Sequence, residues 1–276
     1  MSKSTAILGK AGVGKTFLAA HLGMAFGYLG DKTLVVGCDQ KRDTMRALSG
    51  EVRPSLMEIL EANDFAYDRL HLPEIAVSVT DYVDVLELGP SQLLVGHYGT
   101  VLDEAFHVFE TQGVFGMYDR VLYDVSDERF DAPYVSLFRK VEAAVAVTDD
   151  SAESLFVLNR LLRASLIGSY EYGYPLHIVG VVNNRSVDNL SFERYVERSR
   201  CFPLLTIADT PELAHLRRFH RTLFSLESRS PALERIKDGI LKVAELLRGE
   251  PINLYPVSPL EDEEIWALAP PVSLPS

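Results

Sequence analysis

The sequence predicts a single α/β domain with a mostly parallel sheet of seven or eight strands flanked by helices. Short β-rich runs alternate with longer segments of helical period, an alternation typical of a parallel sheet with helices on both faces. A glycine-rich turn joins the first such run to the first helical segment. The 276 residues suffice to bury one full core, and this length requires no second domain.

The elements follow from apolar runs that end at turn signals. The expected strands are Thr5–Gly9, Thr33–Gly37, Val83–Leu88, Arg120–Val125, Ala143–Thr148, His177–Val182 and Leu204–Ile207. Helices are expected over Lys15–Leu29, Leu56–Ala62, Tyr134–Lys140, Ser151–Ser165, Phe192–Arg200, Glu212–Phe219 and Ala232–Leu247, with another after Gly99. The last of these has its apolar residues at helical spacing, so we expect it to pack against the sheet and assign it no site.

The composition changes after the last helix. We therefore place the domain at residues 1–249 and a proline-rich acidic tail at 250–276. Residues 251–276 hold six of the 14 prolines, four acidic residues and no lysine or arginine. Proline at this density predicts an extended or partly disordered segment. Two interpretations remain open: an inert tail, or a docking segment, in cis or in trans, built around Trp266 and the acidic run before it.

The charge and the cysteine usage exclude several classes of protein. A formal net charge of −12 at pH 7 disfavours binding to nucleic acid or to an anionic membrane, because the long-range field repels both. No hydrophobic signal core and no apolar run of membrane-spanning length occurs, so we expect a cytoplasmic protein. The two cysteines, Cys38 and Cys201, predict neither a disulfide framework nor a zinc site.

The glycine-rich turn fits the pattern G-x-x-x-x-G-K-[ST] between a strand and a helix, which predicts the phosphate-binding loop of a single-domain P-loop NTPase. Its glycines allow backbone N–H groups to converge on a polyphosphate at the positive end of the helix dipole. We expect Lys15 on the β and γ phosphates and the Thr16 hydroxyl on Mg²⁺. The predicted ATP-binding residues of this segment are Gly9, Lys10, Ala11, Gly12, Val13, Gly14, Lys15, Thr16 and Phe17.

Lys10 is a second lysine that the phosphate cradle itself does not require. It is either a solvated surface side chain or a functional one. The stretch from Gly9 to Thr16 resembles the deviant Walker A loop of dimeric P-loop ATPases, in which this lysine reaches the nucleotide of the partner subunit. The resemblance implies a homodimer in which Lys10 neutralises developing phosphate charge in trans.

The segment Val36–Arg46 resembles the first switch of the nitrogenase iron protein and of the L subunits of dark-operative protochlorophyllide reductase. The resemblance implies that Asp39 lies beside the γ-phosphate and positions the attacking water, and that Lys41 and Asp43 belong to the switch. A carboxylate at the end of a parallel strand next to the cradle suits this role. The alternative for Asp39 is a helix N-cap.

The likeness continues over roughly residues 3 to 248. Asp124 ends the apolar run "YDRVLYDV" and matches the Walker B aspartate of the family, so Thr16, Asp43 and Asp124 form the predicted magnesium set. Asn183 matches an asparagine that hydrogen-bonds adenine. Asp209 matches a further nucleotide-contacting loop, although the usual P-R-D is missing. The resemblance thus assigns catalytic roles to Lys10, Lys15, Asp39 and Asp124, with ATP and Mg²⁺ as cofactors.

The sequence departs from the family where its [4Fe–4S] cluster would be bound, since a cluster needs thiolate ligands and no cysteine lies between Cys38 and Cys201. His97 occurs where the first ligand is normally found, and a shorter charged loop, Asp124–Pro133, replaces the second. We therefore expect no iron–sulfur cluster. His97 together with Asp127, Glu128 or Asp131 could bind a divalent metal, but a surface histidine is favoured. We expect Cys38 and Cys201 to be packed side chains.

The second switch also lacks the glycine that senses the γ-phosphate in the family, so ATP binding is predicted more firmly than hydrolysis. The favoured function is a nucleotide-switched homodimer, slowly hydrolysing and not an oxidoreductase, that regulates or helps to assemble a partner such as a nitrogenase-like metalloenzyme. The alternatives are a metal-delivery or maturation ATPase, a non-cycling decoy of an iron protein and, least favoured, a cluster-bearing reductase with unusual ligands.

Overall fold

The computed structural model describes residues 3–67, 70, 72–90, 98–125, 132–186, 190–227, 230–249 and 257–268. Its strands are β1 (Lys3–Gly9), β2 (Thr33–Gly37), β3 (Val77–Thr80), β4 (Val83–Glu87), β5 (Arg120–Asp124), β6 (Ala143–Thr148), β7 (His177–Ser186) and β8 (Pro203–Ala208). The larger helices are α1 (Lys15–Tyr28), α5 (Tyr98–Thr111), α7 (Ala132–Lys140), α8 (Ala152–Tyr172), α9 (Leu190–Ser199), α10 (Pro211–Arg218) and α11 (Pro231–Arg248). Shorter ones are α2 (Asp43–Ser49), α3 (Leu56–Ala62), α4 (Leu72–Ile75), α6 (Val114–Met117), α12 (Asp262–Trp266) and the 3₁₀ turn η2 (Leu223–Ser225).

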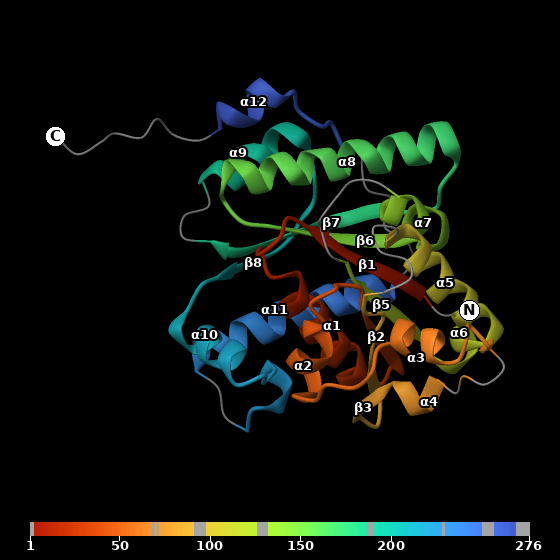
Figure 1. Ribbon diagram of the computed structural model, residues 1–276. Coiled ribbons are helices and arrows are strands. Elements are labelled where there is room, and N and C mark those ends of the chain that lie inside the picture. The colour runs from red at the N-terminus through yellow and green to blue at the C-terminus, as the bar shows by residue number, and fades with distance from the viewer. Residues whose placement is uncertain are drawn as a thin grey trace.

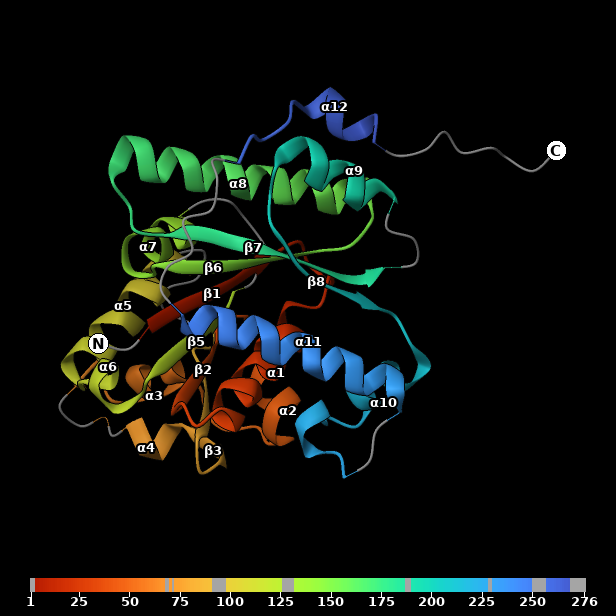
Figure 2. The same cartoon turned by 180° about the vertical axis from the view of Figure 1, so that it is seen from behind.

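The strands form one sheet in the order β3-β4-β2-β5-β1-β6-β7-β8, in which β3 alone of the described strands runs antiparallel to its neighbour. Helices cover both faces: α5, α7, α8 and α9 lie on one side, and α1, α10 and α11 on the other (Figures 1 and 2). The predicted α/β class with a mostly parallel sheet is confirmed. Because the carboxyl ends of β1, β2 and β5 lie side by side, side chains that follow these strands converge at one edge.

The alternation of side chains along the strands divides the interior into two cores. In β1, Ala6 and Leu8 join the core under α5, α7 and α8, whereas Ile7 joins the core under α1 and α11. Val35 and Val145 likewise face α1 and α11, while their chain neighbours face the other way. The central strands are therefore apolar on both faces, as expected for parallel strands that helices cover on both sides.

Three elements named here differ from the sequence-based expectation. The edge strand β3 was not predicted, because its four residues include one fully buried side chain, Val77, and its pairing with β4 is irregular between Ser78 and Thr80. The seven-residue helix α2 occupies a segment that was treated only as a switch. The helix after β6 is longer than predicted, extending to Tyr172.

The acidic segment near the C-terminus also differs from the expectation. Residues 257–268 lie over α8 and α9 and include α12, where the prolines had predicted an extended chain (Figure 1). Glu261 and Glu264 form a reciprocal capping box that starts this helix. Leu260, Ile265 and Leu268 are buried and belong to the same apolar cluster as the buried leucines of α8. No helix among the described residues is both long and apolar enough to cross a bilayer.

Candidate functional site

The loop between β1 and α1 depends on glycine at defined positions. Gly12 and Gly14 have φ values of +81° and +96°, in the left-handed region that side chains disfavour. A Cβ on Gly9 would lie 2.2 Å from the carbonyl oxygen of Val147, and one on Gly14 would lie 2.0 Å from Nδ2 of Asn184. These close approaches bring the loop backbone against β6 and β7, with its N–H groups at the N-terminus of α1.

Lys15 lies inside this loop. Its side chain is buried, and Nζ donates to the carbonyl oxygen of Lys10 at 3.0 Å. The ammonium group is thus held over the same turn whose backbone N–H groups face the pocket. A cation and converging donors in one concave turn suit a polyphosphate ligand.

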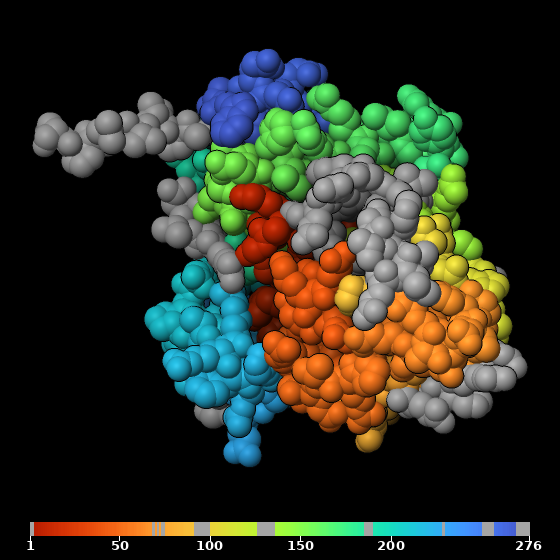
Figure 3. All heavy atoms as spheres, viewed as in Figure 1, coloured from red at the N-terminus to blue at the C-terminus, as the bar shows by residue number. Residues whose placement is uncertain are grey.

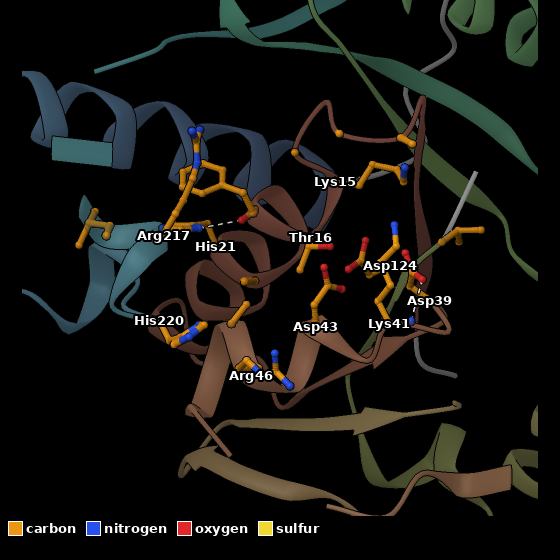
Figure 4. A pocket seen from close by; sticks show the side chains of 18 of the residues that line it. Lys15, Thr16, His21, Asp39, Lys41, Asp43, Arg46, Asp124, Arg217 and His220 are labelled. Atoms are coloured by element: carbon orange, nitrogen blue, oxygen red, sulfur yellow. Dashed lines mark hydrogen bonds between the residues drawn. The ribbon is translucent and has the colours of Figure 1, made fainter. Parts of the chain in front are cut away.

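A cluster of carboxylates lies beside the loop at the ends of neighbouring strands. Asp124 ends β5, is buried, and accepts a 2.8 Å hydrogen bond from the hydroxyl of Thr44. Burial raises the pKa of Asp124 to about 6, against the opposing effect of the nearby hydroxyls of Thr16 and Thr44. Asp43 opens α2, and burial together with the charge of Asp39 raises its pKa. Thr16, Asp43 and Asp124 therefore point toward one region, as Figure 4 shows.

Asp39 follows β2 and accepts a hydrogen bond from the backbone N–H of Lys41 at 2.9 Å. This bond shapes the turn that leads into α2, so Asp39 has a local structural role as well as a place in the pocket wall. Lys41 is exposed and lines the same wall. The N-cap of α2 is Arg42, which leaves Asp39 outside the cap position that was the alternative for it.

These groups line one pocket of about 420 Å³ between the glycine-rich loop, α2 and α10. In the space-filling view the red atoms of the early chain lie in a hollow between the orange surface of α2 and α3 and the blue-cyan surface around α10 (Figure 3). One end of the pocket holds Lys15, Thr16 and the carboxylates. The other end holds Phe17 and His21, with basic residues from α2, α10 and the segment after α10: Arg46, Arg217, His220 and Arg221.

Phe17 is the centre of a stack at this second end. Its ring lies 4.0 Å from that of His21, and the guanidinium carbon of Arg217 lies 4.9 Å from the Phe17 ring centroid. Arg217 also pairs with Asp209, with 3.2 Å between Nη1 and Oδ1. Asp209 thus acts on the pocket through Arg217 rather than from the pocket wall. Arg217 and His21 were not predicted from the sequence, since only the fold brings α10 against α1.

The two asparagines of β7 lie in different surroundings. Asn183 is buried, donates to Asp150 at 3.0 Å, and does not belong to the described pocket wall. Asn184 donates to the carbonyl oxygen of Val13 at 2.6 Å and so fixes the glycine-rich loop from β7. Asn184 was not among the predicted site residues, and the only signal for it in the sequence was its place directly after Asn183.

Lys10 is half-buried and lies outside the described pocket wall, although its neighbours Ala11 and Gly12 belong to it. Its charge acts on Asp149, which follows β6. Burial would raise the pKa of Asp149, but hydrogen bonds from Ser151 and the charge of Lys10 contribute to a net lowering. The Lys10 charge therefore acts on Asp149, and Lys10 is not among the residues of the described pocket wall.

Both cysteines are buried in the core under α5, α7 and α8. Cys38 Sγ contacts the carbonyl oxygen of Val36 at 3.6 Å, and burial raises the pKa of both thiols. His97, Asp127, Glu128 and Asp131 lie outside the described residues. Across the part of the chain that the structure describes, no three or more His, Cys, Asp or Glu side chains are grouped so as to hold a metal ion by themselves. Mg²⁺ does not need such a group, because it commonly retains waters and takes one or two carboxylates plus phosphate oxygens.

A strand, a glycine-rich loop and a helix N-terminus, beside a carboxylate at the end of a neighbouring parallel strand, define a P-loop ATPase fold. The chain belongs to the 4Fe-4S iron sulfur cluster binding proteins of the NifH/frxC family, whose model matches residues 3–270. The resemblance to the nitrogenase iron protein and its relatives is confirmed. The match extends beyond residue 248, where the likeness was expected to end, and includes residues 257–268.

Similar proteins agree with this placement. The chain is 30% identical over 270 residues to the light-independent protochlorophyllide reductase iron-sulfur ATP-binding protein of Halorhodospira halophila, covering 97% of this chain and 88% of that protein. The septum site-determining protein MinD of Pyrococcus horikoshii, complexed with Mg-ADP, matches at a TM-score of 0.66 with 20% identity over 90% of this chain and 96% of that one. MinD in the MinC:MinD complex of Aquifex aeolicus matches at 0.68 with 18% identity over 93% and 100%. The two structural likenesses show a shared fold.

Proposed function

We propose that this protein is an ATP- and Mg²⁺-binding nucleotide switch that acts as a homodimer, hydrolyses ATP slowly, and signals its nucleotide state to a protein partner without an iron–sulfur cluster. The carrying observation is one pocket that joins the loop lysine, Thr16 and the strand-end carboxylates. The known occupants of similar proteins support the ligand: the Halorhodospira relative is an ATP-binding protein, and the Pyrococcus MinD was complexed with Mg-ADP.

In this proposal the loop from Gly9 to Phe17 binds the phosphates, and Thr16, Asp43 and Asp124 hold Mg²⁺ directly or through water. Mg²⁺ would neutralise charge between the phosphate oxygens. Asp39 would orient water at the γ-phosphate, with Lys41 beside it. Asn183 would contact the nucleoside. Asp209 would act on the nucleoside indirectly, by holding the Arg217 side chain over the Phe17 ring.

The cysteine chemistry supports the cluster-free part of the proposal. An iron–sulfur cluster requires thiolates that reach the iron, and a raised thiol pKa opposes ionisation. Both cysteines of the chain are buried in the apolar core. This donor set does not fit the cluster for which the family is named.

The nucleotide part is tested by calorimetric titration of Mg-ATP into the wild type and Lys15→Ala, with Lys32→Ala as an exposed control. We expect saturable binding that Lys15→Ala weakens at least tenfold and Lys32→Ala leaves unchanged. Iron and sulfide analysis of anaerobically purified protein tests the cluster-free part, and stoichiometric iron and sulfide would refute it. Binding without ATP-dependent dimerisation in light scattering would refute the homodimer.

The role of Lys10 in trans is tested by mixing two variants. Lys10→Ala retains Lys15 and therefore an intact phosphate-binding loop. Lys15→Ala retains Lys10, the lysine that would reach the partner's nucleotide. If Lys10 acts across the dimer, each mixed dimer contains one complete site of two. Random pairing of equal amounts makes about half of the dimers mixed, so about a quarter of wild-type ATP hydrolysis should return. If Lys10 acts within its own subunit, the mixture hydrolyses no more ATP than the separate variants.

A further inference from the structure

Helix α2 carries Asp43 and Thr44 but has no cap of its own. Its N-cap residue, Arg42, adopts left-handed dihedrals of φ 52° and ψ 49° and makes no side-chain capping hydrogen bond. The first N–H groups of a helix have no partner within the helix and need acceptors from elsewhere. For α2 this acceptor comes from a different strand: the backbone N–H of Met45 donates to Glu87 Oε1 at 2.6 Å.

Glu87 ends β4 and is enclosed. Its side chain is 1% exposed, and Oε2 is buried without a hydrogen bond to any described residue. A Cβ on Gly37 would lie 2.0 Å from this oxygen, so β2 can pass this carboxyl only with glycine at that point. Glu87 does not belong to the described pocket wall.

The surroundings of Glu87 favour its neutral form. Burial raises its pKa to about 8, and the nearby carboxylates of Asp124 and Asp43 act in the same direction. A neutral carboxyl still accepts a hydrogen bond through its carbonyl oxygen and adds no further negative charge beside the predicted magnesium set.

The first turn of α2 is thus attached to the ends of two strands. Met45 is bound to Glu87 at the end of β4, and the Thr44 hydroxyl donates to Asp124 at the end of β5. Asp43 precedes these two attached residues at the start of α2, and it lines the pocket. We propose that Glu87 is a positioning residue that caps α2 from β4 and so holds Asp43 and Thr44 in the geometry that Mg-nucleotide binding requires. This inference rests on the proposed function for its magnesium part, but the capping contact is testable without any nucleotide.

The test compares Glu87→Met, which fills a similar volume without an acceptor, with Glu87→Gln, which retains one. Glu58→Ala is the matched control, because it removes the Arg42 ion pair and the Glu58 half of the α3 capping box in the same region but leaves Glu87 intact. Hydrogen exchange at the Met45 amide is measured in the nucleotide-free proteins. We expect Glu87→Met to accelerate it about five- to tenfold, the loss expected for a helix cap, and Glu87→Gln and Glu58→Ala to remain within about twofold of the wild type.

The second readout is the Mg²⁺ concentration at half-saturation of ATP binding. It should rise about five- to tenfold in Glu87→Met and return to near the wild-type value in Glu87→Gln. Unchanged Met45 exchange in Glu87→Met overturns the capping role, and equal magnesium effects of the Met and Gln variants overturn the positioning role. If Glu87→Met does not fold, Glu87→Ala replaces it under the same criteria. Wild-type protein that binds no ATP refutes the proposed function, whereas the exchange result still decides the cap.

Discussion

Mild acid should destabilise this fold through His21, a histidine buried in α1. Its side chain is 2% exposed, Nδ1 contacts the carbonyl oxygen of Phe17 at 2.7 Å, and Nε2 accepts from the backbone N–H of Leu223 at 3.1 Å. The Leu223 donor requires an unprotonated Nε2, so the proton lies on Nδ1 and donates to Phe17. Burial lowers the pKa of His21 to about 4, and the charge of Arg217 acts in the same direction, whereas the Phe17 carbonyl opposes it.

The size of the effect follows from the difference between the pKa of His21 in the folded protein and its ordinary pKa of 6.5. Because the pKa is lowered on folding, the unfolded chain binds more protons between pH 6.5 and 4, and the stability contributed by neutral His21 is lost as the pH falls through this window. The complete loss is about 3.4 kcal/mol. About 2 kcal/mol of it is reached on going from pH 7.5 to pH 5.

Urea denaturation of the wild type and His21→Gln at pH 7.5 and pH 5 measures this contribution. Glu87 and Asp124 titrate in overlapping windows, but they are present in both proteins and cancel in the comparison. We expect the stability difference between the wild type and His21→Gln to shrink by about 2 kcal/mol at the lower pH. His220→Gln, a change of an exposed histidine in the same pocket wall, should follow the wild type. A difference for His21→Gln that is the same at both pH values would refute the assignment of a buried neutral imidazole.

Three other changes test the cradle, the C-terminal segment and the thiols. Gly14→Ala forces a side chain into φ +96° and against Asn184, so it should cost at least about 1–2 kcal/mol and abolish Mg-ATP binding, measured by thermal shift and calorimetry. Ile265→Ala removes a fully buried side chain of α12 and should lower the free energy of unfolding by about 2–5 kcal/mol in urea titrations, whereas Trp266→Ala, at a half-exposed position, should cost less. Ellman's reagent should label both cysteines rapidly in guanidinium but neither within minutes in the native protein, and fast native labelling would show that a thiol is accessible.

The sequence predicted those parts of the fold that depend on local pattern. The central strands are apolar runs bounded by turns, and the phosphate loop is a contiguous motif with its context on both sides. Helix α2 could not be predicted in this way, because the acceptor that begins it belongs to Glu87, 42 residues further along the chain. Asn184 acts through a contact 171 residues away in sequence, which no local pattern records. The segment with α12 was missed because its proline content predicts an extended chain, whereas burial of Ile265 stabilises one helical turn between the prolines.

The proposed cluster-free switch is compatible with the way in which the sheet and α2 hold the predicted magnesium set. The groups around the predicted magnesium set belong to the last residues of β4 and β5 and to α2, so their positions are fixed by parallel pairing in the sheet and by the Met45 and Thr44 contacts. In the resembling iron proteins the cluster cysteines belong to the loops that follow those two strands. In the proposed function, loops without these thiolates would lose redox chemistry, while the Thr44 and Met45 contacts that hold α2 would remain. In the proposed switch, a nucleotide-dependent displacement of α2 would be transmitted to α3 through the Arg42–Glu58 ion pair and to β4 through Glu87, a route that needs no iron.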